Sequence, residues 1–209
     1  MPSVPLQFWY EFASTYSYLA AFRIEQLAAK AGVEVAWRPF LLGPIFAEQG
    51  WNDSPFNLYP VKGRYMWRDM ERICQREGLP FRKPSAFPRS SLLATRVAMI
   101  ASPEGWCPEL SRAVFRANFA EDRDISQWET VAEIVKAVGR DPDQVYEKAL
   151  SPDNKEAVKR QTEEAKKIGI FGAPSCVSRG ELFWGNDRLE EALAWHREQA
   201  PGEAASARR

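Results

Sequence analysis

Residues 6–17 read LQFWYEFASTYS, and this stretch determines the expected fold. Its first part, residues 6–12, is short and dense in aromatic side chains, which is typical of a buried strand. Apolar residues at helical spacing then predict a helix over residues 16–31, and Gly32 supplies its end. Residues 33–40 alternate well enough for a second strand. A helix that joins two such strands predicts a right-handed parallel βαβ unit.

The rest of the chain predicts a helical middle and a return to strands. Residues 43–60 are rich in glycine and proline, which indicates a long loop or a short broken helix, and helical patterns then follow as far as residue 168. Residues 175–178 and 181–184 predict a β-hairpin, after which a last helix begins. The fold class is therefore α/β, in the order βαβ, helical insertion, ββα. The predicted parts are one α/β domain of residues 1–42 and 166–200, an all-helical insertion of residues 43–165, and a disordered tail of residues 201–209.

The charge balance excludes some classes of partner. Lysine and arginine together number 28, as do aspartate and glutamate, so no overall field attracts nucleic acid or an anionic membrane. No apolar stretch approaches the ~20 residues that a membrane span needs, and the first residues lack the layout of a secretory signal. We therefore expect a soluble, cytoplasmic protein without nucleic-acid or membrane partners.

Cysteine and histidine give no sign of a metal site or of a hydrolase. The three cysteines, Cys74, Cys107 and Cys176, nowhere form C-x-x-C, which argues against a disulfide framework and against a zinc ribbon. We expect no metal site and assign the cysteines to the core. The one histidine, His196, has no evident serine or carboxylate relay in the sequence, so a Ser-His-Asp hydrolase is disfavoured.

Three short motifs stand at junctions between predicted elements. Residues 14–17 (STYS) lie where a strand ends and a helix begins, a place that either stabilises an anion or simply caps the helix. Residues 170–174 (IFGAP) precede the third strand, and statistics alone favour a trans bond before the proline. Residues 184–188 (WGNDR) are either strand end, turn and helix cap, or a site where Asp187 binds an ammonium group.

Together these motifs resemble those of the 2-hydroxychromene-2-carboxylate isomerases and the related kappa-class glutathione transferases. The similar features are the S-x-x-S, the G-x-F-G-A-P before the third strand, the W-G-N-D-R-L that opens the last helix, and the segment of residues 37–65. The resemblance covers nearly the whole chain. It implies a DsbA-like, thioredoxin-like fold with a helical domain inserted, glutathione as the cofactor, a small aromatic substrate and a homodimer.

The resemblance also implies the site residues. Ser14 matches the family's catalytic serine, and because it has no adjacent base it is better interpreted as a hydrogen-bond donor to the glutathione sulfur than as a nucleophile. Thr15, where relatives commonly place proline, and Ser17 are the second and third choices for this role. The bond before Pro174 should be cis, which leaves the Ala173 backbone free to pair with the tripeptide. The implied glutathione-binding residues are Ala173, Pro174, Gly185, Asn186, Asp187, Asn52 and Lys62.

Three aromatic residues of the middle segment, Trp51, Tyr65 and Phe87, either line a substrate pocket or pack in the core. The activity implied is a glutathione-dependent isomerisation of an unsaturated aromatic keto or carboxylate compound, in which the thiolate adds reversibly and lets a double bond rotate. Two alternatives stay open: a kappa-class-like transferase that forms a stable conjugate, and a non-catalytic module that binds thiols or peptides. A disulfide oxidoreductase is disfavoured, because S-x-x-S cannot cycle through a disulfide.

Overall fold

A four-stranded mixed sheet forms the centre of the α/β part, as the sequence predicted. The computed structural model describes residues 4–199, and the predicted tail of residues 201–209 lies outside them. The sheet has the order β2-β1-β3-β4; β1 pairs parallel with β2 and antiparallel with β3, and β3 pairs antiparallel with β4. Its strands are β1 (Leu6–Tyr10), β2 (Val35–Pro39), β3 (Ser175–Ser178) and β4 (Glu181–Trp184).

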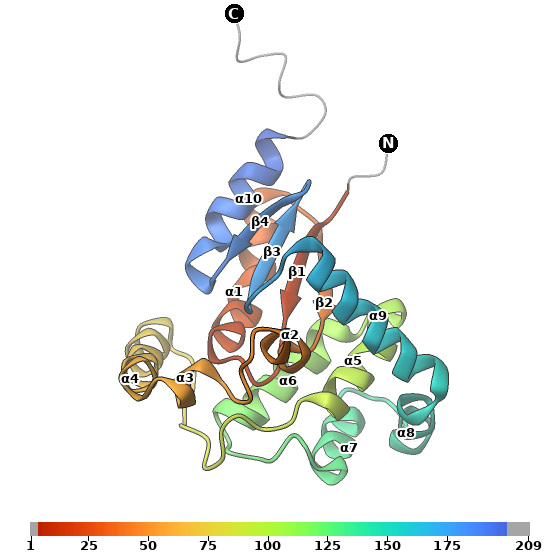
Figure 1. The fold of residues 1–209 in the computed structure, drawn as a ribbon. Coiled ribbons are helices and arrows are strands. Elements are labelled where there is room, and N and C mark those ends of the chain that lie inside the picture. The colour runs from red at the N-terminus through yellow and green to blue at the C-terminus, as the bar shows by residue number, and fades with distance from the viewer. Residues whose placement is uncertain (1–3, 200–209) are drawn as a thin grey trace, which may run out of the picture.

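Helices make up most of the remaining chain, and eight of them lie between β2 and β3 (Figure 1). We call these eight, α2 to α9, the helical insertion. The bounds of the helices in the described chain are α1 (Thr15–Ala31), α2 (Leu42–Glu48), α3 (Pro55–Leu58), α4 (Pro60–Glu77), α5 (Leu92–Glu104), α6 (Cys107–Phe119), α7 (Trp128–Ala137), α8 (Pro142–Leu150), α9 (Pro152–Ile168), the 3-10 helix η1 (Asn186–Arg188) and α10 (Leu189–Glu198).

The alternation of side chains along β1 explains why both faces of the sheet are covered. Phe8 and Tyr10 point into the main core, which they share with α1, α5, α6 and α10. Trp9 points to the opposite face and packs in a second cluster with Phe40, residues of α2 and the end of α9. β1 is therefore a central strand, and the chain that leaves its carboxyl end runs between the sheet and the helical insertion.

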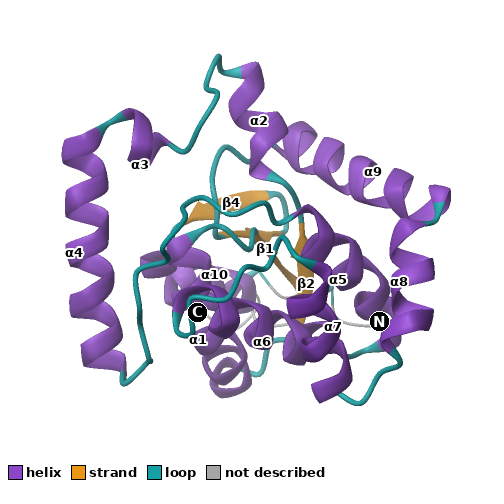
Figure 2. Ribbon diagram, turned by 90° about the horizontal axis from the view of Figure 1, so that it is seen from below, coloured by secondary structure: helices purple, strands orange, loops and turns teal. Residues whose placement is uncertain are grey.

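The helical insertion surrounds that end of the sheet. Figure 2, viewed from below, shows α3 and α4 on one side of the strands, α2 and α9 on another, and α5 to α8 on a third. The division into domains at residues 42 and 165 stays a prediction, and α9 continues across the second boundary as far as Ile168. Within residues 4–199 no helix has the length and apolar character needed to cross a membrane.

Helix α1 begins directly after the strand-to-helix turn, and the residues at its two ends explain where it starts and stops. Ser14 is the N-cap, with its side-chain oxygen accepting a hydrogen bond from the Ser17 N–H. Gly32 ends the helix in the left-handed conformation at φ 67°, which glycine adopts without strain. The positive end of a 17-residue helix thus lies where the chain leaves β1.

Candidate active site

A cavity of about 1080 Å³ opens between the start of α1, the loop before β3, the turn after β4 and the helical insertion. Every predicted site residue except Ser17 lines it. The twelve are Ser14, Thr15, Trp51, Asn52, Lys62, Tyr65, Phe87, Ala173, Pro174, Gly185, Asn186 and Asp187. Residues that are far apart in the sequence are thus brought to one site by the sheet order and by the insertion.

Ser14 joins the start of α1 to the loop before β3. Its hydroxyl donates a hydrogen bond of 2.8 Å to the Ala173 carbonyl and accepts one of 3.2 Å from the Ser17 N–H. The Ala173–Pro174 bond is cis, as the resemblance implied; the trans bond that statistics favoured is wrong. Ser14 is therefore a helix cap as well as a cavity residue, and its hydrogen must leave the Ala173 carbonyl before it can be donated to a ligand.

The other two candidate hydroxyls are less accessible than that of Ser14. Thr15 lines the cavity but is only 1% exposed, and Ser17 is fully buried and lies outside the lining. Neither hydroxyl oxygen has a hydrogen-bond partner within the described chain. Because Ser17 is fully buried and outside the cavity lining, its hydroxyl is the least suited of the three to contact a bound molecule.

Backbone donors at the same place remain available to a ligand. The first N–H groups of a helix have no intrahelical acceptor. Within residues 4–199 the N–H groups of Thr15 and Tyr16 have no protein partner, and neither does that of Ala173. Two donors at the positive end of α1 and one on the cis-proline loop therefore accompany the Ser14 hydroxyl.

Glu11 is a site residue that the sequence analysis missed. Glu11 lines the cavity yet is only 5% exposed; its side chain accepts a hydrogen bond of 2.8 Å from the Ala13 N–H and another from the Ser91 hydroxyl. Burial raises the pKa of Glu11 to about 7, against the lowering effect of these hydrogen bonds. Glu11 lies three residues before Ser14, but the Ser14 hydroxyl bonds to the Ala173 carbonyl and the Ser17 N–H, so the interpretation of Ser14 as a donor and not a nucleophile stays a prediction. The only feature of the sequence that could have identified Glu11 as a site residue is its position as one acidic residue inside an aromatic run.

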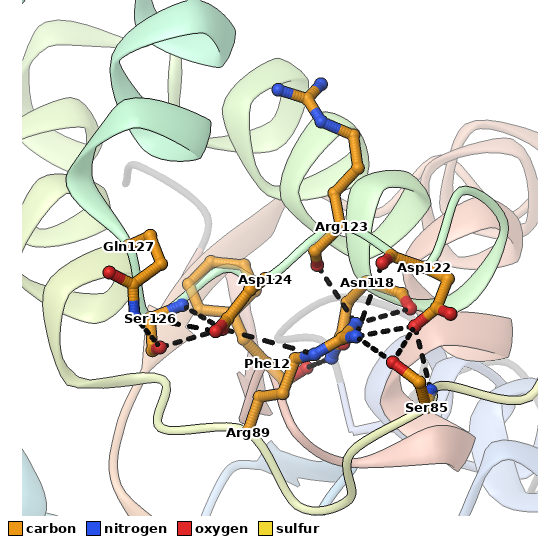
Figure 3. Close-up of polar contacts among 9 residues, drawn as sticks. All are labelled: Phe12, Ser85, Arg89, Asn118, Asp122, Arg123, Asp124, Ser126 and Gln127. Atoms are coloured by element: carbon orange, nitrogen blue, oxygen red, sulfur yellow. Dashed lines mark hydrogen bonds and ion pairs between the residues drawn. The ribbon is translucent and has the colours of Figure 1, made fainter.

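Arg89, a buried arginine of the insertion, is linked through Asn118 to Phe12, the residue after Glu11 (Figure 3). Arg89 donates to the Asn118 side-chain oxygen over 3.1 Å and also bonds to Asp122. The Asn118 amide donates to the Phe12 carbonyl over 3.0 Å. The insertion thus contacts residues 11 and 12 of the α/β part through two separate hydrogen bonds, one from Ser91 and one from Asn118.

The turn after β4 presents one exposed carboxylate. The Asn186 side chain is buried, and its oxygen accepts a bond of 2.9 Å from Arg23. The Asp187 side chain is 75% exposed and lies 3.7 Å from Arg188. The Gly185 N–H bonds to the Pro174 carbonyl over 2.9 Å, which ties this turn to the cis-proline loop. Asp187 is therefore placed to meet an ammonium group, whereas the oxygen of Asn186 is already used to hold the turn.

Aromatic side chains form much of the remaining wall. Trp51 packs against Phe46, with ring centroids 5.4 Å apart, and Phe87 packs against Trp67 at 4.8 Å. Tyr65 is 62% exposed. Phe87 packs against the main core, whereas within the described chain Trp51 belongs to neither core cluster. A role of these aromatic residues in holding a substrate stays a prediction. The two polar residues predicted from the insertion, Asn52 and Lys62, are exposed at the cavity.

His196 has a serine partner that the sequence did not reveal. The Ser178 hydroxyl lies 2.9 Å from its Nδ1, and both side chains are buried. Burial lowers the pKa of His196. Because neither residue lines the cavity, this pair does not act at the site. Within residues 4–199 no group of three potential metal ligands was found.

Comparison with known proteins agrees with this fold. The family model described as the DSBA-like thioredoxin domain matches residues 5–194. A 2-hydroxychromene-2-carboxylate isomerase of Sphingobium xenophagum is 27% identical, over 88% of this chain and 94% of its own. Human glutathione S-transferase kappa 1 is 25% identical, over 88% and 87%. A solved structure of a 2-hydroxychromene-2-carboxylate isomerase, 26% identical, superimposes with a TM-score of 0.83 over 94% of this chain and 97% of that one.

Proposed function

Since the chain belongs to the family of DSBA-like thioredoxin domains, we propose that it is a glutathione-dependent isomerase. Its substrate is an unsaturated aromatic keto or carboxylate compound of the 2-hydroxychromene-2-carboxylate type. The observation that carries the proposal is Ser14 at the start of α1, hydrogen-bonded to the carbonyl that precedes the cis Pro174, with both residues lining one large cavity. Relatives named as such isomerases, similar over most of the chain, support the reaction class.

The residues present fit glutathione. The Ala173 N–H can pair with a peptide carbonyl, Asp187 can bind the γ-glutamyl ammonium group, and Lys62 carries a positive charge suited to a carboxylate. The cavity volume, about 1080 Å³, lies just above the roughly 300–1,000 Å³ of ordinary ligand pockets. It therefore has room for the tripeptide and a small aromatic molecule together.

Glutathione, when bound, supplies a sulfur that adds reversibly to the conjugated double bond of the substrate and so allows that bond to rotate. The chain supplies the environment for the negative charge on this sulfur. The N–H groups of Thr15 and Tyr16 and the positive end of α1 stabilise an anion, and the Ser14 hydroxyl can turn from Ala173 to donate to it. The aromatic wall from the insertion holds the substrate ring and excludes water.

Replacing Ser14 by alanine tests the proposal. Loss of one positioned donor to a developing anion typically costs about 10²–10³ in rate. We expect a comparable fall in turnover of a hydroxychromene-type substrate, with glutathione binding retained in calorimetry. The matched control is Ser102→Ala, on the exposed surface of α5, which should behave as wild type. An unchanged rate in Ser14→Ala would move the role to another hydroxyl.

A kappa-class-like transferase is the second candidate, favoured by the similarity to human glutathione S-transferase kappa 1. The two functions share the addition of sulfur and differ in the fate of the adduct. Incubation with glutathione and the substrate should yield the isomer; a stable conjugate without isomer would establish the transferase. Absence of glutathione binding at millimolar concentration would instead favour a non-catalytic module. The predicted homodimer and cytoplasmic location stay predictions, and sedimentation analysis tests the first.

A further inference from the structure

Glu11 is a buried acid that the proposed role of Ser14 leaves without a task. It follows the last residue of β1 and lies beside the turn that carries Ser14 into α1. Glu11 lines the same cavity as Ser14 while remaining almost fully buried. A carboxyl group in such a place is poorly solvated, yet it can exchange a proton with a molecule in the cavity.

The surroundings of Glu11 contain no ion-pair partner for it. Its hydrogen-bond donors are all uncharged: the Ser91 hydroxyl, the Ala13 N–H and, with the smallest effect on its pKa, the Ser14 N–H. Arg89, which also lines the cavity, is occupied by Asn118, Asp122 and neighbouring carbonyls. Among residues 4–199 no salt bridge to Glu11 is formed. The other titratable side chains that line the cavity are Tyr16, Asp53, Lys62, Tyr65, Arg89, Asp187 and Arg188.

An ionised Glu11 and a thiolate at the start of α1 disfavour each other. Two like charges in a poorly solvated site raise each other's pKa, so that such a pair holds one proton between them. Burial already raises the pKa of Glu11 to about 7, so its carboxyl group can be ionised or protonated near neutral pH. The site can therefore keep a single negative charge that moves between carboxylate and sulfur.

We propose that a carboxylate oxygen of Glu11 accepts the thiol proton when glutathione binds at the start of α1, and returns it when glutathione leaves. In this step the S–H bond breaks, its electron pair stays on sulfur, and an O–H bond forms on Glu11, so the net charge of the site is unchanged. Ser91 and the Ala13 N–H position the carboxyl group and set how readily it holds the proton. This inference rests on the proposed function, since it requires glutathione in the cavity.

The test counts the protons released to solvent when glutathione binds. Calorimetric titrations in buffers of different ionisation enthalpy give this number. At about pH 8 free Glu11 is ionised, while a free thiol with a pKa near 8.5 is mostly protonated. Wild type should then release almost no proton, because Glu11 takes it up, whereas Glu11→Gln should release close to one. S-methylglutathione has no thiol proton, so its binding to either protein should release no proton to solvent.

Two further variants keep the proposal falsifiable. Glu71→Gln, on the exposed surface of α4, is the matched control and should match wild type. Ser91→Ala keeps Glu11 but removes a hydrogen bond that lowers its pKa. Glu11 should then hold its proton to higher pH, and the pH at which proton release falls should move upward. An unchanged midpoint in Ser91→Ala would overturn the role of Glu11 even if Glu11→Gln did not fold.

The outcomes separate this inference from the proposed function. Ultraviolet absorbance of the bound thiolate reports the sulfur directly, without any turnover. If both wild type and Glu11→Gln form the thiolate and release the same number of protons to solvent, the role of Glu11 is refuted. The glutathione site is not affected by that result. Absence of glutathione binding, or of any thiolate signal, in wild type would refute the proposed function itself.

Discussion

Replacing Glu11 by glutamine should make the stability of the protein less dependent on pH. Burial raises the pKa of this carboxyl group from its ordinary 4.5 to about 7 in the folded chain. Between these pH values Glu11 is protonated when the chain is folded and ionised when it is unfolded. Glutamine of nearly the same size keeps an oxygen acceptor for Ala13 but carries no charge in either state.

The size and sign of the effect follow from the linkage between proton binding and folding. Because the folded state binds more protons in this pH range, raising the pH favours the unfolded state. The contribution of Glu11 to the free energy of unfolding is fully present below pH 4.5 and decreases as the pH rises. It is lost completely above about pH 7. At about 1.4 kcal/mol per pH unit, the interval between the two values corresponds to about 3 kcal/mol. The Glu11→Gln variant lacks this loss.

Urea denaturation of both proteins from pH 4.5 to about pH 8 measures the effect. The free energy of unfolding of Glu11→Gln, minus that of wild type, should increase by about 3 kcal/mol over this range. Other titrating groups affect both proteins equally and cancel in the difference. The exposed Glu71→Gln should show no such trend. A difference between Glu11→Gln and wild type that stays constant with pH would refute the reasoning.

Three further predictions concern the surroundings of the site. Asn118→Ala leaves the buried Phe12 carbonyl without its hydrogen-bond donor and removes one of the acceptors of Arg89, which keeps Asp122, and should lower the free energy of unfolding by about 1–3 kcal/mol in urea denaturation. Asp187→Ala should weaken glutathione binding by up to about fivefold in calorimetry, because an exposed ion pair contributes at most about 1 kcal/mol; full affinity would discredit the γ-glutamyl contact. Burial raises the pKa of all three free thiols, so Cys74, Cys107 and Cys176 should react with an aromatic disulfide reagent only after unfolding, and rapid labelling of the native protein would contradict this.

The fold could be predicted because its signals are local. The aromatic run at the start of the chain and the helical spacing after it identified β1 and α1. The predicted strand extended to residue 12, whereas β1 ends at Tyr10, where its pairing with Pro39 of β2 ends. The amino-acid pattern cannot show where a partner strand stops. For the same reason the pattern of the proline-rich residues 43–60 predicts only a loop or a broken helix, and these residues contain most of α2 and all of α3.

The site could be predicted only in part, because some of its contacts join distant parts of the sequence. The S-x-x-S and the residues around Pro174 lie next to predicted elements, so their position followed from the order of those elements. The contact between Glu11 and Ser91 joins residues 80 positions apart, and that between Phe12 and Asn118 joins residues 106 apart. No spacing rule connects them, and the packing of the helical insertion on the end of β1 creates both.

These distant contacts give the helical insertion a second task besides enclosing the substrate. Ser91 donates to the carboxyl group of Glu11, and Asn118, held by Arg89, fixes the carbonyl of the next residue. On the proposed mechanism Glu11 holds the proton that the sulfur gives up, so the insertion influences the charge on sulfur through Ser91. Substitutions at Ser91 should therefore change the pH at which the thiolate forms, while the contacts of glutathione with Ala173 and Asp187 are preserved.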